Sequence, residues 1–425
     1  MIIEFAVENF RSIKSRQVFN MVRSKTAGLE VNSFDPSIDG VTPLLCSSAI
    51  YGANAAGKSN FIKALDAMQD IVLDSAKNTQ RGNSLPVIHH KLCETTIDQP
   101  TEFEVIFVSA GVKYQYGFSA TKDRVMEEWL YAFPKSRPQR WFIREYDKEN
   151  QEYVWDFSSL FTGKKQVWKD ATKGNSLFLS TAIMLNNDQL KPVYDWFAET
   201  LKVTGIGGWS GSYTAEYCTE DTKQKKSVLK FLNSVDLDIS DLSLETKKFD
   251  TSSFPENMPK EMKEKIIEDF KDKEYVDIKT VHETLQGNKV LFDLEEESDG
   301  TRKLFSFAGP WLDALQNGLV LFIDELHDNL HPNIVKFLVS VFHCKKSNPN
   351  NAQLIFTTHE SSILDQDIFR RDQIWFCKKE KDQSSNFYPL TDFSPRKGTE
   401  NLEKSYLAGR YGALPVTSFF ELNEE

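Results

Sequence analysis

The alternation of apolar and polar positions predicts two strands and a helix at the beginning of the chain. Ile3 to Phe10 carries apolar residues at odd positions as far as Val7, which is typical of a strand. A second strand is expected around residues 49–51, where an apolar stretch leads into a turn rich in Gly and Ala. Phe61, Ile62, Leu65, Met68 and Val72 then follow at helical spacing. The first 75 residues therefore predict strand, loop, strand, tight turn and helix.

The middle of the chain has a different pattern. Alternating apolar residues on both sides of Ala110-Gly111 predict a β-hairpin within residues 101–156, and a second hairpin joins 141–143 to 153–155. Residues 175–202 and 222–234 favour helices, and 260–273 favours one short charged helix.

Strand signals return near the end of the chain, at 290–292, 320–323 and 353–356. The last two are continuous apolar runs, as expected of strands buried on both faces of a parallel sheet. Helices are expected at 302–317 and 333–343. We therefore expect an α/β fold with a mostly parallel sheet that is split in sequence by a mixed α+β insert.

This organisation predicts four segments. Residues 1–75 and 285–395 are expected to form the two halves of the main domain. Residues 76–284 form an insert with β-hairpins and a short helical arm, part of which packs on that domain. Residues 396–425 form a tail rich in aromatic residues and Gly, which either packs on the domain or docks a partner.

Composition narrows the functional classes. The 425 residues include 51 Lys and Arg against 62 Asp and Glu, a formal charge of −11, which argues against nucleic-acid binding over the whole surface but not against a local basic groove. The five cysteines are far apart and odd in number, which fits a reducing compartment. No apolar run is long enough to span a membrane, and no basic leader is present. We expect a cytoplasmic protein without membrane contact.

The segment after the second strand matches the phosphate-binding pattern G-x-x-x-x-G-K-[ST] in full. Its glycines allow backbone N–H groups to surround phosphate oxygens, and the following helix adds its positive end. Lys58 can reach the β- and γ-phosphates, and the Ser59 hydroxyl can bind Mg²⁺. The sequence therefore predicts ATP and Mg²⁺ as cofactors. The residues expected to bind them are Gly52, Ala53, Asn54, Ala55, Ala56, Gly57, Lys58, Ser59 and Asn60.

Two carboxylates follow the apolar run at 320–323. Because ligands of open α/β sheets bind at the carboxyl ends of the strands, Asp324 is expected to bind Mg²⁺ and Glu325 to act as general base toward water. The alternative is a strand that ends in a solvated acidic turn.

His359 follows the apolar run at 353–356. At a strand end it would lie beside the γ-phosphate, to which its imidazole can donate a hydrogen bond. The alternative is a histidine that only completes the strand end. Lys58, Glu325 and His359 are the expected catalytic residues.

Taken in order, these motifs resemble a known family. The likeness is carried by Asn9-Phe10-Arg11-Ser12-Ile13-Lys14, Tyr51 to Asn60, Asp324-Glu325-Leu326 followed by Leu330-His331-Pro332, and Tyr406 to Pro415. The chain is similar to the ABC-type ATPase heads of SMC proteins and to OLD-type ATPases, above all to the RloA and AbiL-type ATPases of bacterial phage defence. The resemblance covers both ends of the chain, about half of it.

The resemblance implies a head-to-tail pair of heads, in which the signature segment of one closes over the γ-phosphate held by the other. Ser298-Asp299-Gly300-Thr301 matches that segment, with Ser298 and Gly300 as expected ligands of the nucleotide and Asp299 as a departure from the family pattern. The same residues also fit a simple helix cap.

Two further positions follow from the resemblance. His331 stands where such proteins normally supply an interfacial Asp, and Arg11 matches a basic residue that can touch phosphate. The alternative for Arg11 is a solvated surface residue.

The function that we expect is an ATP-binding and hydrolysing switch, a homodimer or higher homo-oligomer, that controls a separate nuclease or toxin in antiviral defence. The first alternative is an SMC-like ATPase of DNA repair or DNA-end processing, and a weaker one is a transporter subunit. The insert has too few heptad repeats to form a coiled-coil arm, and the segment after His359 is too short for the nuclease domain of OLD proteins. Nucleic acid is compatible with this function but not required by it.

Overall fold

The structure is a computed structural model that describes residues 1–25, 28–77, 80, 82–248, 260, 263, 274–395 and 400–415. Most of the helix expected at 260–273 lies outside these residues. The chain forms two units, Met1–Ile206 with Ala314–Glu425 and Gly207–Asp313. These boundaries differ from the four segments expected from the sequence.

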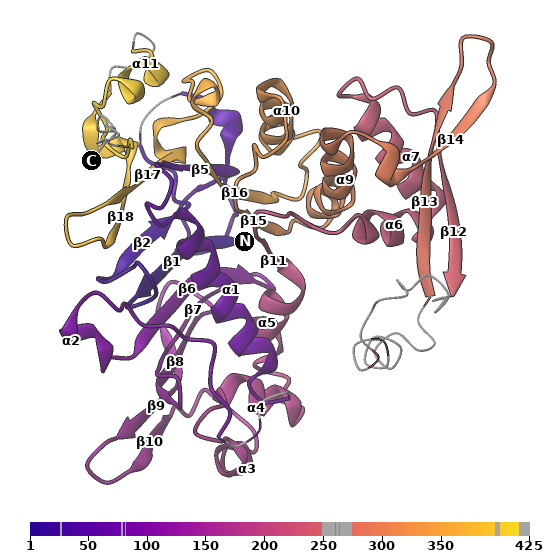
Figure 1. Cartoon of the computed structure of the whole chain (residues 1–425). Helices are drawn as coiled ribbons and strands as arrows, with labels where there is room; N and C mark the ends of the chain where they lie inside the picture. The colour runs from indigo at the N-terminus through magenta and orange to yellow at the C-terminus, as the bar shows by residue number, and fades with distance from the viewer. Residues whose placement is uncertain are drawn as a thin grey trace. The chain divides into compact units, whose positions relative to one another are not determined.

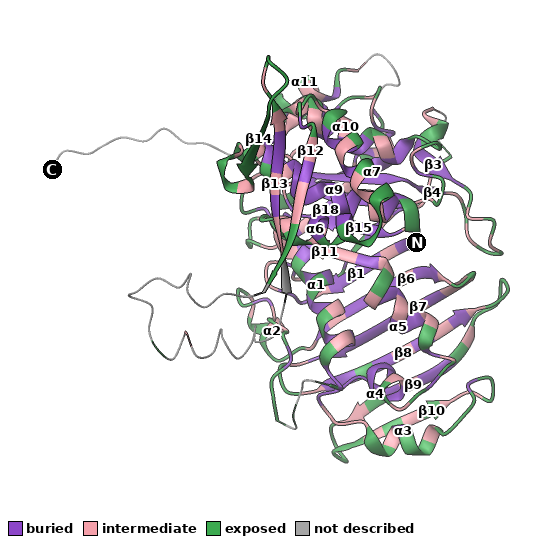
Figure 2. Ribbon diagram, turned by 90° about the vertical axis from the view of Figure 1, so that its right-hand side faces the viewer, coloured by how far each residue is buried: buried purple, intermediate pink, exposed green. Residues whose placement is uncertain are grey.

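An antiparallel sheet in the first unit begins with the chain's first strand. Its order is β10-β9-β8-β7-β6-β1-β2, so both expected hairpins are present and β6 pairs directly with β1. Purple, buried stretches recur along β6, β7 and β8, where one face of the sheet meets the core (Figure 2). The strand bounds are Ile2–Glu8 (β1), Gln17–Asn20 (β2), Thr101–Ser109 (β6), Val112–Ala120 (β7), Val125–Phe133 (β8), Gln139–Asp147 (β9) and Glu152–Phe157 (β10).

A second sheet of the same unit has the order β11-β15-β16-β5-β17-β18 and is parallel except for β18. Its central strands are buried along their whole length, as their continuous apolar runs predict. The bounds are Ser47–Gly52 (β5), Leu201–Thr204 (β11), Val320–Ile323 (β15), Gln353–Thr358 (β16), Ile374–Lys379 (β17) and Ser385–Pro389 (β18). The expected α/β class with a mostly parallel sheet split in sequence is confirmed.

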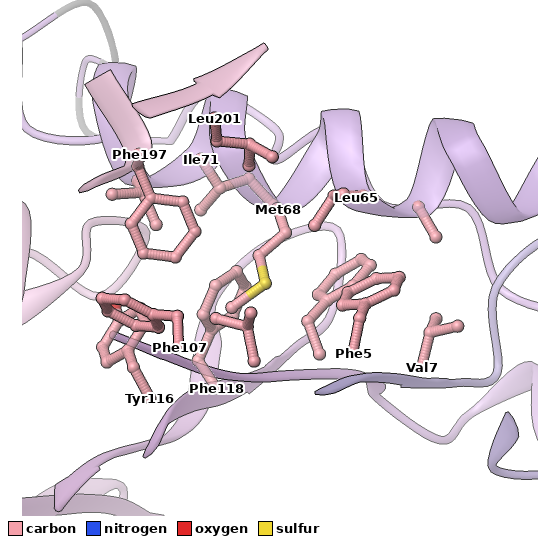
Figure 3. Close-up of a cluster of buried hydrophobic side chains, with 14 of the residues drawn as sticks. Phe5, Val7, Leu65, Met68, Ile71, Phe107, Tyr116, Phe118, Phe197 and Leu201 are labelled. Carbon is pink, nitrogen blue, oxygen red and sulfur yellow. The ribbon is translucent and has the colours of Figure 1, made fainter. Parts of the chain in front are cut away.

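Helix α1, Lys58–Asp74, contacts β1 and β6 of one sheet and β5 and β11 of the other. Its apolar stripe, which includes Leu65, Met68 and Ile71, faces side chains such as Phe5 and Phe118 (Figure 3). A single 17-residue helix thereby links both sheets to one core, and it starts at the phosphate-binding loop.

Shorter elements complete the first unit (Figure 1). The helix expected over 175–202 is broken, and its last two residues are already part of β11. The remaining bounds are Ser33–Phe34 (β3), Leu44–Leu45 (β4), Glu94–Ile97 (α2), Lys165–Ala171 (α3), Phe178–Met184 (α4), Lys191–Asp195 (α5), a π-helical turn at Trp196–Thr200, Pro332–His343 (α10) and Leu402–Leu407 (α11). Turns of 3-10 helix occur at Glu30–Asn32, Ser361–Ile363, Arg371–Gln373 and Leu390–Phe393.

The second unit pairs helices with an antiparallel sheet of order β12-β13-β14. Helix α6 contacts β13 and α7 contacts β12. The bounds are Gly211–Glu220 (α6), Thr222–Asn233 (α7), Asp241–Lys248 (β12), Glu274–Glu283 (β13), Lys289–Asp293 (β14), Leu294–Glu296 (3-10 helix) and Asp299–Asn317 (α9), whose last residues belong to the first unit.

The described part of the C-terminal tail, residues 400–415, packs on the parallel sheet. Tyr406 and Tyr411 both stack on Phe376 of β17, each with ring centroids 5.5 Å apart. The Glu400 carboxylate accepts hydrogen bonds from Ser405 and Arg410, which fix the turn between these tyrosines. Among the described residues, no helix combines the length and the apolar character needed to cross a membrane.

Candidate nucleotide-binding site

Both glycines of the phosphate-binding loop are required by the packing around them. A Cβ on Gly52 would lie 2.3 Å from the carbonyl oxygen of Cys377, on the neighbouring strand β17. Gly57 has φ +115°, and a Cβ there would lie 1.9 Å from Ser385 Oγ. At Gly57 only glycine satisfies both the left-handed backbone and the close approach, and at Gly52 the close approach alone excludes a side chain. The loop is therefore held tightly at both ends, while Asn54 and Ala55 at its tip are exposed.

Lys58 is buried at the first position of α1. Its Nζ donates to the carbonyl oxygens of Gly52, at 2.7 Å, and Ala53, at 3.2 Å. Burial lowers the pKa of Lys58, whereas Cys377 and the carboxylates of Glu325 and Asp324 act in the opposite direction. The ammonium group is thus positioned inside the loop and lies within the electrostatic reach of both acids.

A hydroxyl network joins the loop to the first turn of the chain. Ser385 Oγ donates to Ala56 O, at 2.6 Å, and lies 2.7 Å from Ser12 Oγ, which accepts a hydrogen bond from Asn60 Nδ2 at 2.8 Å. Arg11, next to Ser12, is half-buried with φ 50°. The structure therefore places Arg11 one residue from a direct contact with the start of α1.

The acid pair is organised by one hydroxyl group on the adjacent strand. Thr357 Oγ1 of β16 donates to Asp324 Oδ1, at 2.5 Å, and accepts the backbone N–H of Glu325, at 2.8 Å. Asp324 is buried, and Glu325 has φ 53°, a left-handed conformation that costs non-glycine residues on the order of 1–2 kcal/mol. Thr357 thus holds both acids at the end of β15 and stabilises the unusual backbone of Glu325.

Strand register brings the three motifs to one edge of the sheet. Ile323 lies opposite Phe356, and Thr358 lies opposite Tyr51, so the acids, His359 and the phosphate-binding loop follow adjacent parallel strands. Strands β15, β16 and β5 are neighbours in that order. This is the edge at which open α/β sheets bind ligands.

His359 forms a pair with a histidine that the sequence analysis did not select. His359 Nε2 lies 3.0 Å from His327 Nε2, and His327 Nδ1 lies 3.0 Å from Thr358 Oγ1. Burial and the charges of His359 and Lys58 lower the pKa of His327 to about 4. The side chain of His359 is exposed, as a contact with a bound phosphate requires.

His331 is the N-cap residue of helix α10. Its Nδ1 accepts the backbone N–H of Asn333 at 3.2 Å, and Pro332 occupies the first helical position. His331 is exposed, and its expected role between two heads stays a prediction.

Ser298 and Gly300 belong to the second unit. Ser298 Oγ accepts the N–H of Thr301 at 3.2 Å and lies 2.8 Å from Thr301 Oγ1, which is the helix-cap arrangement. Asp299 forms an exposed ion pair with Arg302. Gly300 lies in the first turn of α9. Contact of this segment with a nucleotide stays a prediction.

The residues expected to bind Mg²⁺ are compatible with that ion. Ser59 and Asp324 offer a hydroxyl and a carboxylate, and Mg²⁺ usually takes one or two protein oxygens together with phosphates and water. In the part of the chain that the structure describes, no cluster of three or more His, Cys, Asp or Glu side chains could hold a metal ion.

Sequence reasoning did not select Thr357, His327 or Ser385, and it gave Ser12 no role of its own. The available signals were weak: two threonines at the end of an apolar run, and a histidine two residues after Glu325. Their importance depends on contacts between distant parts of the chain.

A groove of about 800 Å³ lies on the antiparallel sheet, and its lining includes Asn9 and Lys14 but no residue of the phosphate-binding loop, the acid pair or His359. Most of its charged lining residues are acidic, including Glu127 and Glu145, which lie opposite each other on β8 and β9. Such a lining does not suit phosphate groups.

The fold and this edge of the sheet define a P-loop nucleotide-binding protein of the α/β class. The family model described as "AAA domain, putative AbiEii toxin, Type IV TA system" matches residues 47–365. The match includes the phosphate-binding loop, the acid pair and His359, and the chain belongs to this family.

Solved structures give weaker similarities. The SMC head domain from Thermotoga maritima has a TM-score of 0.39 and 11% identity, covering 91% of this chain and 98% of that one. An SMC head bound to the C-winged helix domain of ScpA has a TM-score of 0.39 and 12% identity, and the match covers 91% of this chain and 97% of that one. The recombination mediator RecF with ATP has a TM-score of 0.36 and 15% identity, and the match covers 91% of this chain and 99% of that one. TM-scores this low support no functional inference. A search of curated proteins gave no match.

Proposed function

We propose that this protein binds ATP together with Mg²⁺ and hydrolyses the γ-phosphate bond. The observation that carries this proposal is the junction at Thr357, on the strand between the one that delivers Asp324 and Glu325 and the one that leads into the Lys58 loop. A solvated acidic turn would need neither a buried Asp324 nor the left-handed backbone of Glu325.

Each residue has a separate task in this proposal. Backbone N–H groups of the loop and the ammonium of Lys58 bind the phosphates, and Ser59 and Asp324 hold the metal ion. Mg²⁺ supplies neutralisation of phosphate charge. Glu325, half-buried at the strand end, accepts a proton from the attacking water.

Two copies of the chain complete the site in this proposal. Ser298 and Gly300 of one copy would close over the phosphate held by the other, with His331 and Arg11 near the same junction. The support is the resemblance to ABC-type heads and the start of α9 at this segment, because the first N–H groups of a helix attract anions.

The switch is proposed to control a separate toxin or nuclease in phage defence, within the RloA and AbiL-type branch. The support for a role in defence is the family's own description, which calls the matched domain a putative toxin of a type IV toxin–antitoxin system. The resemblance of the motif order points in the same direction.

Phosphate release by the purified protein tests the enzymatic part. Glu325→Gln is expected to lower turnover by about 10²-fold or more while ATP still binds, which is the usual effect of losing a general base. Lys58→Ala is expected to lose nucleotide binding, and EDTA to stop hydrolysis. Glu152→Gln, at an exposed position on β10, is the matched control with unchanged activity. Full activity of Glu325→Gln would contradict the assignment of the base.

A capture experiment tests the biological part. Tagged Glu325→Gln, loaded with ATP, is purified from its host, and bound protein and nucleic acid are identified. A stoichiometric toxin or nuclease supports the switch. DNA ends without a protein partner would favour a DNA-processing ATPase instead.

A further inference from the structure

A continuous chain of hydrogen bonds ends at the ring of His359. The N–H of Glu360 donates to Thr358 Oγ1 at 3.0 Å, and that hydroxyl lies 3.0 Å from His327 Nδ1. His327 Nε2 lies 3.0 Å from His359 Nε2, with the two rings nearly perpendicular at 75°. Thr358 is fixed because it is the last residue of β16 and pairs with Tyr51. These hydrogen bonds are therefore fixed in place by the backbone of the parallel sheet.

The pairing restricts the protonation of both rings. Two Nε2 atoms at this distance share one proton, because two facing N–H groups would repel each other. His327 is half-buried, and its lowered pKa, about 4, keeps it neutral near neutral pH. If the Thr358 hydroxyl donates to His327 Nδ1, His327 donates through Nε2, and a neutral His359 then carries its proton on Nδ1. If the direction is reversed, a His359 that still donates to phosphate must be cationic and again uses Nδ1.

The contact with His327 also restrains the side chain of His359, which has few other contacts. His359 is exposed, and within the described residues its ring has no hydrogen bond other than the one to His327. Without that contact the imidazole could rotate among several rotamers. An ordered donor is worth more in catalysis than a mobile one, because orientation is then already established before the reaction.

We propose that His327 is a positioning residue that engages Nε2 of His359, so that His359 presents Nδ1–H to the γ-phosphate. This inference rests on the proposed ATPase function and adds to it a residue that acts through another residue. His327 itself does not touch the nucleotide in this proposal. In this arrangement Nε2 of His359 is occupied by His327, and Nδ1 is the nitrogen left to contact the γ-phosphate.

A double-mutant cycle tests the proposal. His327→Phe keeps a ring but removes both nitrogens, and is expected to lower kcat about 10-fold while the affinity for ATP changes less than about 2-fold. In a His359→Ala background the same substitution is expected to have no further effect, because its target is gone. His327→Gln, which can place an amide near the original Nε2, is expected to recover part of kcat. Thermal melting confirms that each variant is folded.

The outcomes separate this inference from the function on which it depends. If His327→Phe leaves kcat unchanged, or lowers it equally with and without His359, the positioning role is wrong. If wild-type hydrolysis does not depend on Lys58, the proposed ATPase function fails, and the positioning role fails with it. Lys58-dependent hydrolysis with strong coupling between His327 and His359 supports both.

Discussion

The phosphate-binding edge of the parallel sheet and the start of α9 are built in opposite ways. At the sheet edge, several selected groups are held by a neighbour from another part of the chain: Thr357 contacts the acids, Ser385 contacts the phosphate-binding loop and His327 contacts His359. At the start of α9, the hydrogen bonds of Ser298 go to Thr301 and Arg302 within the first turn, and Asp299 pairs with Arg302. One region is pre-organised by tertiary contacts, and the other is a locally complete helix cap.

This difference indicates a division of labour. In the proposed function, the groups at the sheet edge act on a phosphate without rearrangement, and such pre-organisation is the main source of electrostatic catalysis. The start of α9 satisfies its own hydrogen bonds within the first turn, so its residues fold without a ligand. We therefore expect nucleotide binding to be a property of one chain, and fast hydrolysis to need a second chain.

The largest effect is expected from Ser298→Arg, which adds bulk and charge at the start of α9. Hydrolysis should fall by about 10²-fold or more and lose its dependence on protein concentration, because the second chain no longer closes over the phosphate. ATP binding by the single chain should remain. The measurements are phosphate release against concentration and binding of a fluorescent ATP analogue.

Gln286→Arg is the matched control, because it adds the same charge at an exposed turn between β13 and β14. Equal loss of activity in both variants would show a general charge effect and not a blocked junction.

An intermediate effect is expected from Thr357→Val, which preserves shape but removes the hydroxyl shared by Asp324 and Glu325. Leaving a buried carboxylate oxygen and an N–H without partners costs about 1–3 kcal/mol, and turnover should fall about 10-fold as the base loses its orientation. Urea unfolding and kcat are the measurements. Thr357→Ser keeps the hydroxyl and should behave much like the wild type; a defect as large as that of Thr357→Val would point to packing instead.

The smallest effect is expected from Asp299→Asn. The Asp299–Arg302 pair is exposed, so its loss should change the free energy of unfolding by less than about 1 kcal/mol. Hydrolysis should change less than about 2-fold if the carboxylate stays with Arg302 and away from phosphate. A large increase in hydrolysis would show that Asp299 normally repels the phosphate. The start of α9 would then act on the same phosphate as the edge of the parallel sheet, although its local structure is that of a helix cap.

The parts of the fold that could be predicted are those with a strong local pattern. The apolar runs of β15 and β16 are too short for a typical helix, and β6 and β7 alternate with period two, so these elements follow from the sequence. Strand β11 was not predicted, because its four residues, Leu201–Thr204, directly follow helical segments. Its pairing with β15, more than 100 residues away, decides its conformation.

The same division holds within the site. The phosphate-binding loop, Asp324, Glu325 and His359 could be selected because each follows a strand and carries the right chemistry. Thr357 and His327 could not, since a threonine in a strand and a histidine in a turn are ordinary residues until their neighbours are known.

The sequence by itself determined the class of sheet, the phosphate-binding loop and the order of the chemical motifs, because these depend on local periodicity and on short fixed spacings. Only the tertiary structure decided that one threonine hydroxyl would join two acids and that one histidine would hold another. Such contacts depend on the register between strands that are distant in sequence, and burial of the whole core fixes that register.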